Sequence, residues 1–365
     1  MSGGAPGAGA GSIPERALDI DAEWLEEALS ARHPGTKVTS VDLLGESQAT
    51  NAHARLRVTR HGAAGAPETL FCKLLPSDEP RRQAIAASRM GLHEALFYER
   101  LAPSLRLRVP VAHVVRLEET DGRFILLLED LIDSGCTIPD GTVGVERDPA
   151  AAALEDLAGM HVRFEDAATR RSEAGWVPEP QPPSDYGSLR LQSALERHRE
   201  RLSRPFAEMA ELYVRERDRI HPVWHAGPKT VIHGDLHLGN LFVDQGRIGF
   251  LDWGLLTVST PLRDLSYFLQ LSLSIEERRA EERYLIRHYL DVRRALGGEP
   301  FSFEEAWRCH RLQASYLAPA CCQIVTFPED VTPERRRFSE AFLARAEAAI
   351  EDLESRDALR RLAGI

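Results

Sequence analysis

Cysteine is scarce in this sequence, with five residues in a chain of 365. They are Cys72, Cys136, Cys309, Cys321 and Cys322. None has the paired spacing of a metal-binding motif, and an odd number in a chain of this size indicates reduced thiols. We interpret the adjacent Cys321 and Cys322 as core thiols on a helix rather than as a redox pair. This cysteine usage is typical of a cytoplasmic protein.

Long hydrophobic runs are also missing. No segment approaches the roughly 18 uninterrupted apolar residues of a membrane-spanning helix. The N-terminus lacks the basic start and apolar run of a signal peptide. We therefore predict a soluble, cytoplasmic protein with no membrane partner.

Basic residues are too few to balance the acidic ones. The chain has 45 Lys and Arg against 56 Asp and Glu, which gives a formal net charge of -11. Because a protein that binds a polyanion needs a basic face, this balance argues against nucleic acid as the partner. It is compatible with a cationic substrate without requiring one.

The order of predicted elements divides the chain into two parts after a Gly- and Ala-rich segment, 1–12, that we expect to be a disordered tail. Strands are predicted at 38–44, 52–59, 69–75, 112–117 and 123–128, with helices at 21–32, where Asp21 is the expected cap, and 79–101. Beyond these, helices are predicted at 148–164, 187–221, 275–296, 302–322 and 333–362, with a surface loop at 167–184. This order predicts an α+β protein with an antiparallel-sheet N-lobe at 13–131 and a mainly helical C-lobe at 132–365.

One segment of the helical part has a strand pattern: Val231 to Gly254, VIHGDLHLGNLFVDQGRIGFLDWG. It predicts a strand at 241–243, a turn at 244–246 and a return strand at 248–251. Because a hairpin brings its two ends together, we expect Asn240 and Asp252 to face each other. Their oxygens would then share one Mg²⁺ ion, with Asp235 beside it.

Residues of this segment match the pattern of a phosphoryl-transfer site. Such a site needs a metal clamp and a carboxylate that accepts the proton of the attacking hydroxyl. The protein-kinase catalytic loop reads His-Arg-Asp, four residues, Asn, with a metal-binding Asp further on. Here His233, Asp235, Asn240 and Asp252 have the same order and spacing. We assign Asp235 as the catalytic residue and Asn240 and Asp252 as Mg²⁺ ligands.

The same segment resembles a family of small-molecule kinases. The run from His233 to Asn240, His-Gly-Asp-Leu-His-Leu-Gly-Asn, has Gly234 where protein kinases have Arg, and Trp253 stands where they have Phe. With these two differences, the segment resembles the aminoglycoside phosphotransferase and choline kinase-like family. This family includes the ecdysteroid kinase-like branch. A further element similar to this family, Pro261-Leu262-Arg263-Asp264-Leu265, follows Asp252 closely. The interval between them is too short for the long activation segment of a protein kinase. A protein substrate is therefore disfavoured.

The resemblance implies a protein kinase-like two-lobe fold, ATP as donor and a small-molecule hydroxyl acceptor. An aminoglycoside, a choline-like compound, a sugar and a lipophilic alcohol all remain open as acceptors. His233 and Asp264 are implied to support the catalytic loop structurally. For His237 we make no choice between contacting phosphate or acceptor and filling the loop.

Lys73 lies in the third predicted strand between apolar residues. A lysine in such a strand commonly points to solvent. In kinases, however, a strand lysine binds the nucleotide phosphates and is held by a glutamate of the next helix. We therefore assign Lys73 to ATP, with Glu94 favoured over Glu99 as its partner.

Two further segments are candidate contacts of the nucleotide. The first is the predicted loop at 45–51, where Gly45 and Ser47 are expected near phosphate, although an ordinary hairpin turn explains this loop equally well. The second is the acidic end of the fifth predicted strand, where Glu129 and Leu131 are expected at a hinge that pairs with adenine. Trp307, His310, Tyr316 and Glu304 are candidates for the acceptor pocket, and they fit helix packing equally well.

Two other functions fit part of the sequence pattern. His233, Asp235 and His237 have the short spacing of metal ligands, which suits a metal-dependent hydrolase but leaves Asn240 and Lys73 unexplained. A catalytically silent nucleotide-binding protein of the same fold is the second alternative, supported only by the glycine-poor loop at 45–51. Hydrolysis without nucleotide would favour the first, and ATP binding without phosphate transfer would favour the second.

Overall fold

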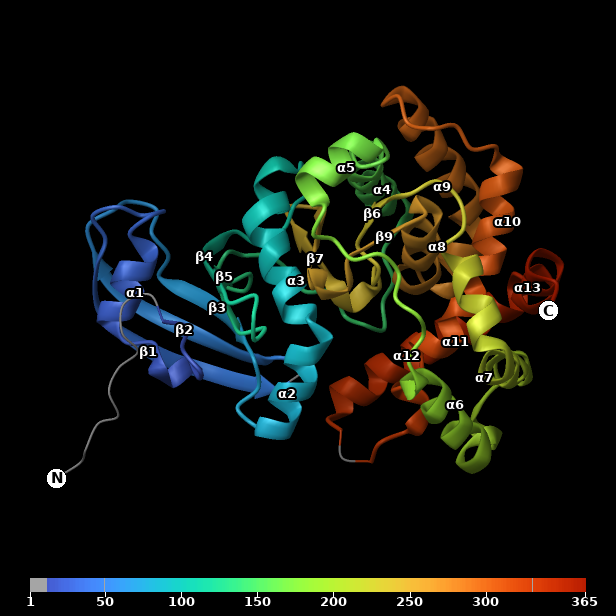
Figure 1. Ribbon diagram of the computed structural model, residues 1–365, viewed down its shortest axis with the longest axis horizontal. Helices are drawn as coiled ribbons and strands as arrows, with labels where there is room; N and C mark the ends of the chain where they lie inside the picture. The colour runs from blue at the N-terminus through green and yellow to red at the C-terminus, as the bar shows by residue number, and fades with distance from the viewer. Residues whose placement is uncertain (1–11, 49, 330) are drawn as a thin grey trace. The chain divides into compact units, whose positions relative to one another are not determined.

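The computed structural model describes residues 12–48, 50–329 and 331–365, which form two compact units (Figure 1). Unit 1 contains the described residues up to Thr137 together with Leu251–Leu255. Unit 2 contains the described residues of Ile138–Phe250 and Leu256–Ile365. The predicted tail at 1–12 lies outside the described residues except for Ser12.

Unit 1 is built on a five-stranded antiparallel sheet with the strand order β1-β2-β3-β5-β4. The strands are β1 (Lys37–Gln48), β2 (Ala52–His61), β3 (Thr69–Leu74), β4 (Ala112–Leu117) and β5 (Phe124–Glu129). All five predicted strands are thus confirmed. The predicted loop at 45–51 begins too early, because Gly45 still pairs with Arg55 and β1 continues to Gln48.

The two faces of this sheet have different roles. Successive residues of a strand point to opposite faces, and residues paired across strands share a face. Cys72 pairs with Leu127, and both belong to the hydrophobic core that Trp24 of helix α1 (Ala22–Leu29) completes. Lys73 pairs with Leu126 and therefore points to the other face. The sheet thus presents Lys73 on the side away from α1.

Helix α1 begins as its sequence predicts. The Asp21 carboxylate accepts the backbone N–H of Trp24 over 2.8 Å, which confirms the predicted cap. The helix ends at Leu29, three residues before the predicted end. A short 3₁₀ turn, η1 (Ala17–Asp19), precedes it.

The predicted continuous helix at 79–101 is wrong. Its parts are α2 (Glu79–Ser88), α3 (Met90–Leu96), the π-helical η2 (Phe97–Leu101) and the 3₁₀ turn η3 (Ala102–Ser104). Arg89 has a φ of 58°, a left-handed conformation that ends α2. Packing explains the new direction, because α2 buries no residue whereas α3 lies so close to the sheet that a Cβ on Gly91 would be 2.0 Å from the Phe124 ring. The helical spacing of apolar residues in the sequence does not reveal such a break.

Unit 2 is mainly helical. Its longer helices are α4 (Arg147–Arg163), α5 (Ala167–Ala174), α6 (Asp185–Arg197), α7 (Arg204–Trp224), α8 (Pro261–Ser272), α9 (Ile275–Ala295), α10 (Phe303–Gln313), α12 (Pro333–Asp352) and α13 (Ser355–Ala363). Its short helical turns are η4 (Arg199–Arg201), η5 (Leu238–Asn240), η7 (Ala314–Tyr316), α11 (Leu317–Ala320) and η8 (Ile324–Thr326). Every residue of α8 is buried, and this helix packs against α9, α10 and α12.

The predicted segments 167–184 and 333–362 of unit 2 need correction. The loop predicted at 167–184 contains α5, whose cap Asp166 accepts the backbone N–H of Thr169 over 2.7 Å. The prolines of this segment therefore mark only its second half. The helix predicted at 333–362 is broken between α12 and α13, where Glu354 has a φ of 46°.

Unit 2 also holds two small antiparallel sheets. Strands β7 (Leu241–Asp244) and β8 (Arg247–Phe250) confirm the predicted hairpin, with a turn in which Gln245 and Gly246 both have positive φ. The sequence pattern predicts strands in the helical part at this hairpin alone, and that expectation is wrong. Strand β6 (Thr230–Ile232) pairs with β9 (Thr257–Ser259), and β6 lies against α8.

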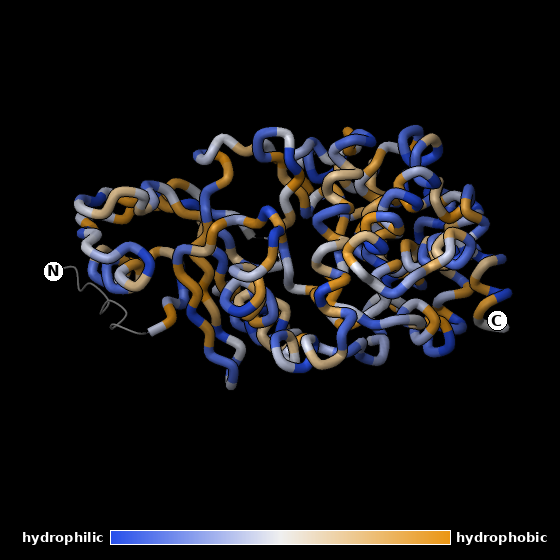
Figure 2. Tube along the Cα trace, turned by 90° about the horizontal axis from the view of Figure 1, so that it is seen from above, coloured by the Kyte–Doolittle hydropathy of each residue, from blue (hydrophilic) through white to orange (hydrophobic). Residues whose placement is uncertain are grey.

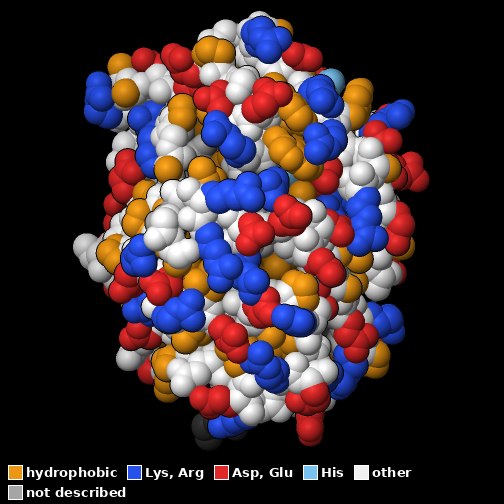
Figure 3. Space-filling model, turned by 90° about the vertical axis from the view of Figure 1, so that its right-hand side faces the viewer, with side chains coloured by type: hydrophobic (Ala, Val, Ile, Leu, Met, Phe, Trp, Pro, Cys, Tyr) orange, Lys and Arg blue, Asp and Glu red, His pale blue; other side chains and the backbone are white. Residues whose placement is uncertain are grey.

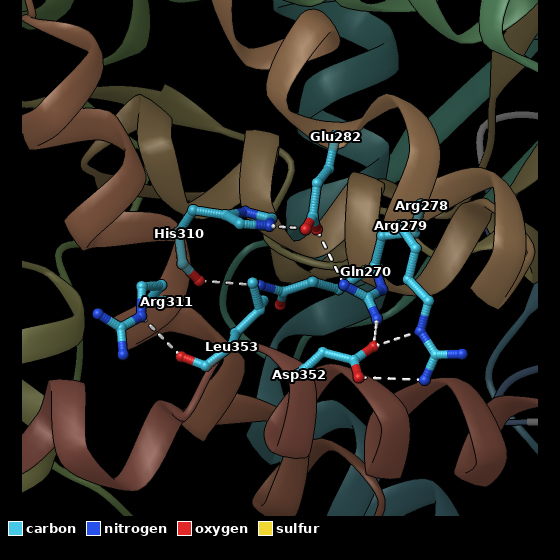
Figure 4. A network of polar contacts seen from close by, with 8 residues as sticks. All are labelled: Gln270, Arg278, Arg279, Glu282, His310, Arg311, Asp352 and Leu353. Carbon is cyan, nitrogen blue, oxygen red and sulfur yellow. Dashed lines mark hydrogen bonds and ion pairs between the residues drawn. The ribbon is translucent and has the colours of Figure 1, made fainter.

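A polar network ties the helices α9, α10 and α12 together (Figure 4). The buried Arg278 donates to Glu282 over 2.9 Å and also pairs with Asp352. Glu282 in turn accepts from the buried His310 ring over 3.2 Å. Because removal of one partner leaves an uncompensated buried charge, such a network specifies how the helices pack.

The distribution of apolar and charged side chains agrees with helices that pack through one face. Figure 2 shows hydrophobic and hydrophilic stretches alternating along the tube.

Among the helices of the described residues, none combines the length and hydrophobicity that crossing a bilayer requires. Figure 3 shows basic and acidic side chains intermingled on the face that it presents.

Candidate functional site

Lys73 of β3 is the centre of a buried ion-pair cluster in unit 1. Its Nζ lies 2.6 Å from Glu94 Oε2 of α3 and 2.9 Å from Asp252 Oδ1. Lys73 and Glu94 are only 5% and 2% exposed, whereas the Asp252 side chain is 53% exposed. The structure therefore brings together the predicted site residues Lys73, Glu94 and Asp252, and it leaves the Asp252 carboxylate accessible.

The position of Asp252 depends on the residues beside it. Asp252 has a φ of 59°, a left-handed conformation that Asp tolerates better than most residues. The next residue, Trp253, begins the 3₁₀ turn η6 (Trp253–Leu255), and its ring stacks on Phe97 at a centroid distance of 3.8 Å. The fully buried Trp253 thus anchors this short segment to unit 1.

The charges of this cluster depend on one another. Burial alone would lower the pKa of Lys73, but the carboxylates of Glu94 and Asp252 raise it above its ordinary value. Burial raises the pKa of Glu94 to about 7, although Lys73 opposes this shift. Lys73 therefore stays a cation at neutral pH.

The other predicted nucleotide contacts also lie in unit 1. Gly45 and Ser47 are exposed residues of strand β1 rather than of a loop. The Glu129 carboxylate accepts from the Arg108 guanidinium over 2.9 and 3.0 Å, so its side chain has a partner within the unit. The carbonyl of Leu131 accepts the N–H of Cys136 over 2.9 Å in the turn that follows β5.

Asp235 of unit 2 lies in the loop between β6 and η5, and it is held by side chains from two directions. The Asn240 amide donates to the Asp235 carboxylate Oδ2 over 3.1 Å and to its carbonyl over 2.8 Å. The Tyr267 hydroxyl of α8 donates to Oδ1 over 3.1 Å. Each oxygen of the carboxylate therefore has a donor, which fixes its orientation.

Asp264 holds the backbone of the same loop. Its fully buried carboxylate accepts the N–H groups of His233 over 2.7 Å and of Gly234 over 2.9 Å, and the His161 ring lies 3.2 Å away. Gly234 has a φ of 86°, which explains why Gly suits the position that is Arg in protein kinases. Burial alone would raise the pKa of Asp264, but its donors, His161 foremost, lower it.

His237 contacts Asp235 from the other side of the loop. Its Nδ1 accepts the backbone N–H of Gly239 over 3.0 Å, so the proton of the neutral ring lies on Nε2. Nε2 lies 3.6 Å from Asp235 Oδ2. Gly239 permits this arrangement, because a Cβ there would lie 2.9 Å from His237 Cε1.

These neighbours keep Asp235 ionised. Burial alone would raise the pKa of Asp235, but His237, His233 and Tyr267 lower it below its ordinary value. At neutral pH the group is therefore a carboxylate, the form that accepts a proton from a hydroxyl.

Tyr267 is a contact that sequence reasoning missed. It follows Asp264 by three residues, so both side chains lie on one face of α8 and both reach the loop of Asp235. Helix spacing was the available signal. Of the four acceptor candidates, Tyr316 is the one that lies near Tyr267, at a ring distance of 5.8 Å.

The other three acceptor candidates have different surroundings. His310 is fully buried in the network of Figure 4. Trp307 has the Arg283 guanidinium over its ring at 4.0 Å, and Glu304 is exposed.

The predicted Mg²⁺ ligands belong to different units. Asn240 directly precedes β7 in unit 2, and Asp252 follows β8 by two residues in unit 1. The register pairs Leu241 with Phe250, so the hairpin closes next to Asn240. That the two residues share one ion stays a prediction.

The ring nitrogens of His233 and His237 bear on the metal-hydrolase alternative. In the part of the chain that the structure describes, no group of three or more His, Cys, Asp and Glu has the arrangement of a metal site. His233 and His237 both use Nδ1 to accept backbone N–H groups, those of Asp235 and Gly239. Each ring therefore offers at most Nε2 to a metal.

Comparison with known proteins gives the family. A model described as the phosphotransferase enzyme family matches residues 52–298, more than half of the chain. The chain belongs to this family. The match includes the loop of Asp235, the hairpin and the helix that carries Asp264, and it confirms the predicted resemblance. A comparison with curated proteins found no match.

Solved structures of two phosphotransferases and a choline kinase are similar to this chain. The GDP complex of aminoglycoside 2'-phosphotransferase-IIIa is 15% identical with a TM-score of 0.50, over 91% of this chain and 99% of that one. Choline kinase LicA from Streptococcus pneumoniae is 16% identical with a TM-score of 0.49, over 91% and 98%. Macrolide 2'-phosphotransferase MphH from Brachybacterium faecium is 18% identical with a TM-score of 0.47, over 88% and 97%. The predicted α+β, kinase-like fold is confirmed.

Proposed function

We propose that this member of the phosphotransferase enzyme family transfers the γ-phosphoryl group of ATP, in a Mg²⁺-dependent reaction, to a hydroxyl group of a small molecule. The observation that carries the proposal is the set of hydrogen bonds at Asp235. Asn240 donates to one oxygen of its carboxylate and Tyr267 to the other, and the neighbouring groups hold its pKa below the ordinary value. That is the arrangement a hydroxyl needs in order to lose its proton as it attacks phosphorus.

The other residues of the proposed site act on the nucleotide or support the catalytic loop. Lys73 is held as a cation by Glu94 and donates to the phosphates. We assign Gly45 and Ser47 to the phosphates, and Glu129 and Leu131 to the hinge that pairs with adenine. His233 and Asp264 maintain the loop that carries Asp235.

The donor set fits Mg²⁺. Asn240 uses its amide NH₂ group on Asp235, which leaves its Oδ1 for a cation. Asp252 offers a carboxylate whose side chain is 53% exposed. Oxygen ligands of this kind, completed by phosphate and water, are those that Mg²⁺ prefers. When bound, the ion would neutralise charge on the phosphates during transfer.

A screen of acceptors tests the function. The protein would be incubated with ATP and Mg²⁺ and with aminoglycosides, choline, sugars or lipophilic alcohols, and ADP and phosphorylated product would be measured by mass spectrometry. We expect a product that appears only with nucleotide and Mg²⁺. Hydrolysis of a compound without nucleotide would instead favour the metal-dependent hydrolase. Tight ATP binding without ADP formation across the panel would favour the silent nucleotide-binding protein.

A further inference from the structure

Arg263, the third residue of α8, is a buried cation without a counter-anion. Only 7% of its surface is exposed. Its Nη1 donates to the His225 ring over 2.9 Å, and its guanidinium lies over the Tyr316 ring with Cζ 4.2 Å from the centroid. Its Nε is buried without a hydrogen-bond partner. Within the described ranges, no carboxylate forms an ion pair with Arg263, and its partners are the rings of His225 and Tyr316.

Other buried arginines of unit 2 have oxygen partners. Arg278 pairs with Glu282, Arg293 with Glu165, and Arg345 donates to the carbonyls of Leu273, Gly141 and Thr142. Arg278 and Arg293 thus have carboxylate counter-ions, whereas the guanidinium of Arg345 is solvated by carbonyl oxygens. The surroundings of Arg263 are instead a neutral ring and an aromatic face.

The start of α8 adds a second feature that favours an anion. Arg263 lies in the first turn, where the helix dipole is positive and a cation is unfavourable. The cap residue, Thr260, makes no side-chain hydrogen bond to this turn. The carboxylate of Asp264, also in the first turn, points to the loop of His233. A positive helix end and an uncompensated guanidinium thus coincide, and both attract an anion.

This positive end lies along the same helix face as the contact to Asp235. Arg263 and Tyr267 are four residues apart, so they share one face of α8 at a spacing of about 6 Å along the axis. The Tyr267 hydroxyl donates to Asp235, and the rings of Tyr267 and Tyr316 are 5.8 Å apart. Two neighbouring tyrosines therefore connect the guanidinium to the carboxylate.

We propose that Arg263 binds an anionic oxygen group of the acceptor, a carboxylate or a phosphate, so that the substrate is a small hydroxylated anion. This inference rests on the proposed function, because it assumes that the hydroxyl of the same molecule reaches Asp235. The planar guanidinium matches the geometry of either group.

His225 supports this arrangement by remaining neutral. Burial, and then Arg263, lower the pKa of His225 to about 2. The ring therefore accepts a hydrogen bond from Arg263 and adds no second charge. Its Nδ1 also lies 2.8 Å from the Ser259 hydroxyl, so the ring has a fixed orientation.

Calorimetric binding with matched anionic and neutral probes tests the proposal. The probes are 5-hydroxypentanoate against 5-hydroxypentanamide, and glycerol 3-phosphate against glycerol, so that the two pairs distinguish carboxylate from phosphate. We expect at least one anion to bind the wild-type protein at least tenfold more tightly than its neutral counterpart. Arg263→Met and Arg263→Gln should abolish the preference, and Arg263→Lys should keep part of it. The exposed Arg294→Met is the control and should bind like wild type.

Thermal unfolding supplies a second readout. Removal of an uncompensated charge should leave the melting temperature of Arg263→Met unchanged or raise it, because Met retains apolar contact with Tyr316. A lower melting temperature together with an unchanged anion preference would assign Arg263 a structural role and overturn the proposal. Failure of both anions to bind the wild-type protein more tightly than their neutral counterparts would also overturn it.

ADP release separates this inference from the proposed function. If neutral alcohols support Asp235-dependent ADP release as well as the anions do, the phosphotransferase function stands and the anion site fails. If anion binding depends on Arg263 but no hydroxyl compound of the panels yields ADP, the anion site stands and the phosphotransferase function fails.

Discussion

The Asn240 amide donates to both the side chain and the main chain of Asp235, at 3.1 and 2.8 Å. Four residues lie between the two in sequence, and the short turn η5 closes this loop. One amide therefore fixes the carboxylate and the backbone that carries it. The same arrangement turns the Asn240 oxygen away from Asp235 and leaves it for a cation.

Replacement of Asp235 by Asn should stop phosphate transfer without preventing nucleotide binding. The amide cannot accept the proton of the hydroxyl, so we expect turnover to fall by a factor on the order of 10² or more. ATP affinity should stay within a few-fold. Steady-state ADP release and a fluorescence titration would measure the two quantities, with the surface variant Asp291→Asn as the control. Full turnover in Asp235→Asn would refute the assigned role.

The Asp252→Ala variant should lose the Mg²⁺-dependent part of nucleotide affinity. Its carboxylate is the accessible oxygen donor beside Lys73. ADP binding would be measured by calorimetry with Mg²⁺ and with a chelator. We expect the ratio of the ADP affinity with Mg²⁺ to the ADP affinity with chelator to fall at least tenfold in Asp252→Ala. Asp121→Ala, a surface change in the same unit, should preserve this ratio. An undiminished Mg²⁺ effect would remove Asp252 from the metal site.

Tyr267→Phe should slow turnover and change its pH dependence. The hydroxyl donates to the ionised form of Asp235, so its removal raises the pKa of that carboxyl. The fall in turnover at acidic pH should then begin at a higher pH than in the wild type. A hydrogen bond to a charged group suggests a loss of about tenfold at neutral pH. Tyr213→Phe, which alters another buried tyrosine of unit 2, is the control. Identical pH profiles for Tyr267→Phe and wild type would exclude this role.

His225 should make the protein less stable as the pH falls below about 6.5. Its pKa in the folded protein is lowered to about 2, so the unfolded chain takes up a proton in this range and the folded protein does not. The free energy of unfolding is therefore highest above the unfolded pKa and decreases with falling pH. Urea denaturation between pH 8 and pH 5 should give a shallower decrease in His225→Gln than in wild type. The exposed His61→Gln serves as the control, and equal slopes in all three proteins would contradict the prediction.

Local chemistry explains what the sequence predicted correctly. The hairpin from Leu241 to Phe250 follows from its turn residues, and the start of α1 follows from Asp21, because both depend on neighbours a few residues away. The order and spacing of His233, Asp235 and Asn240 reflect a loop that a single short segment builds. These features required no knowledge of distant contacts.

Long-range packing decided the rest. The left-handed Arg89 that breaks the helix exists because α3 packs against the sheet at Phe124, and the burial of Trp253 against Phe97 places Asp252 beside Lys73. Arg263 looks like any helical arginine in sequence, since its lack of a counter-anion depends on which side chains surround it. The sequence determined the motif and the class of fold, because propensity and spacing act locally. Only the tertiary structure decided which charges are buried and which have partners, because burial is a property of residues far apart in the chain.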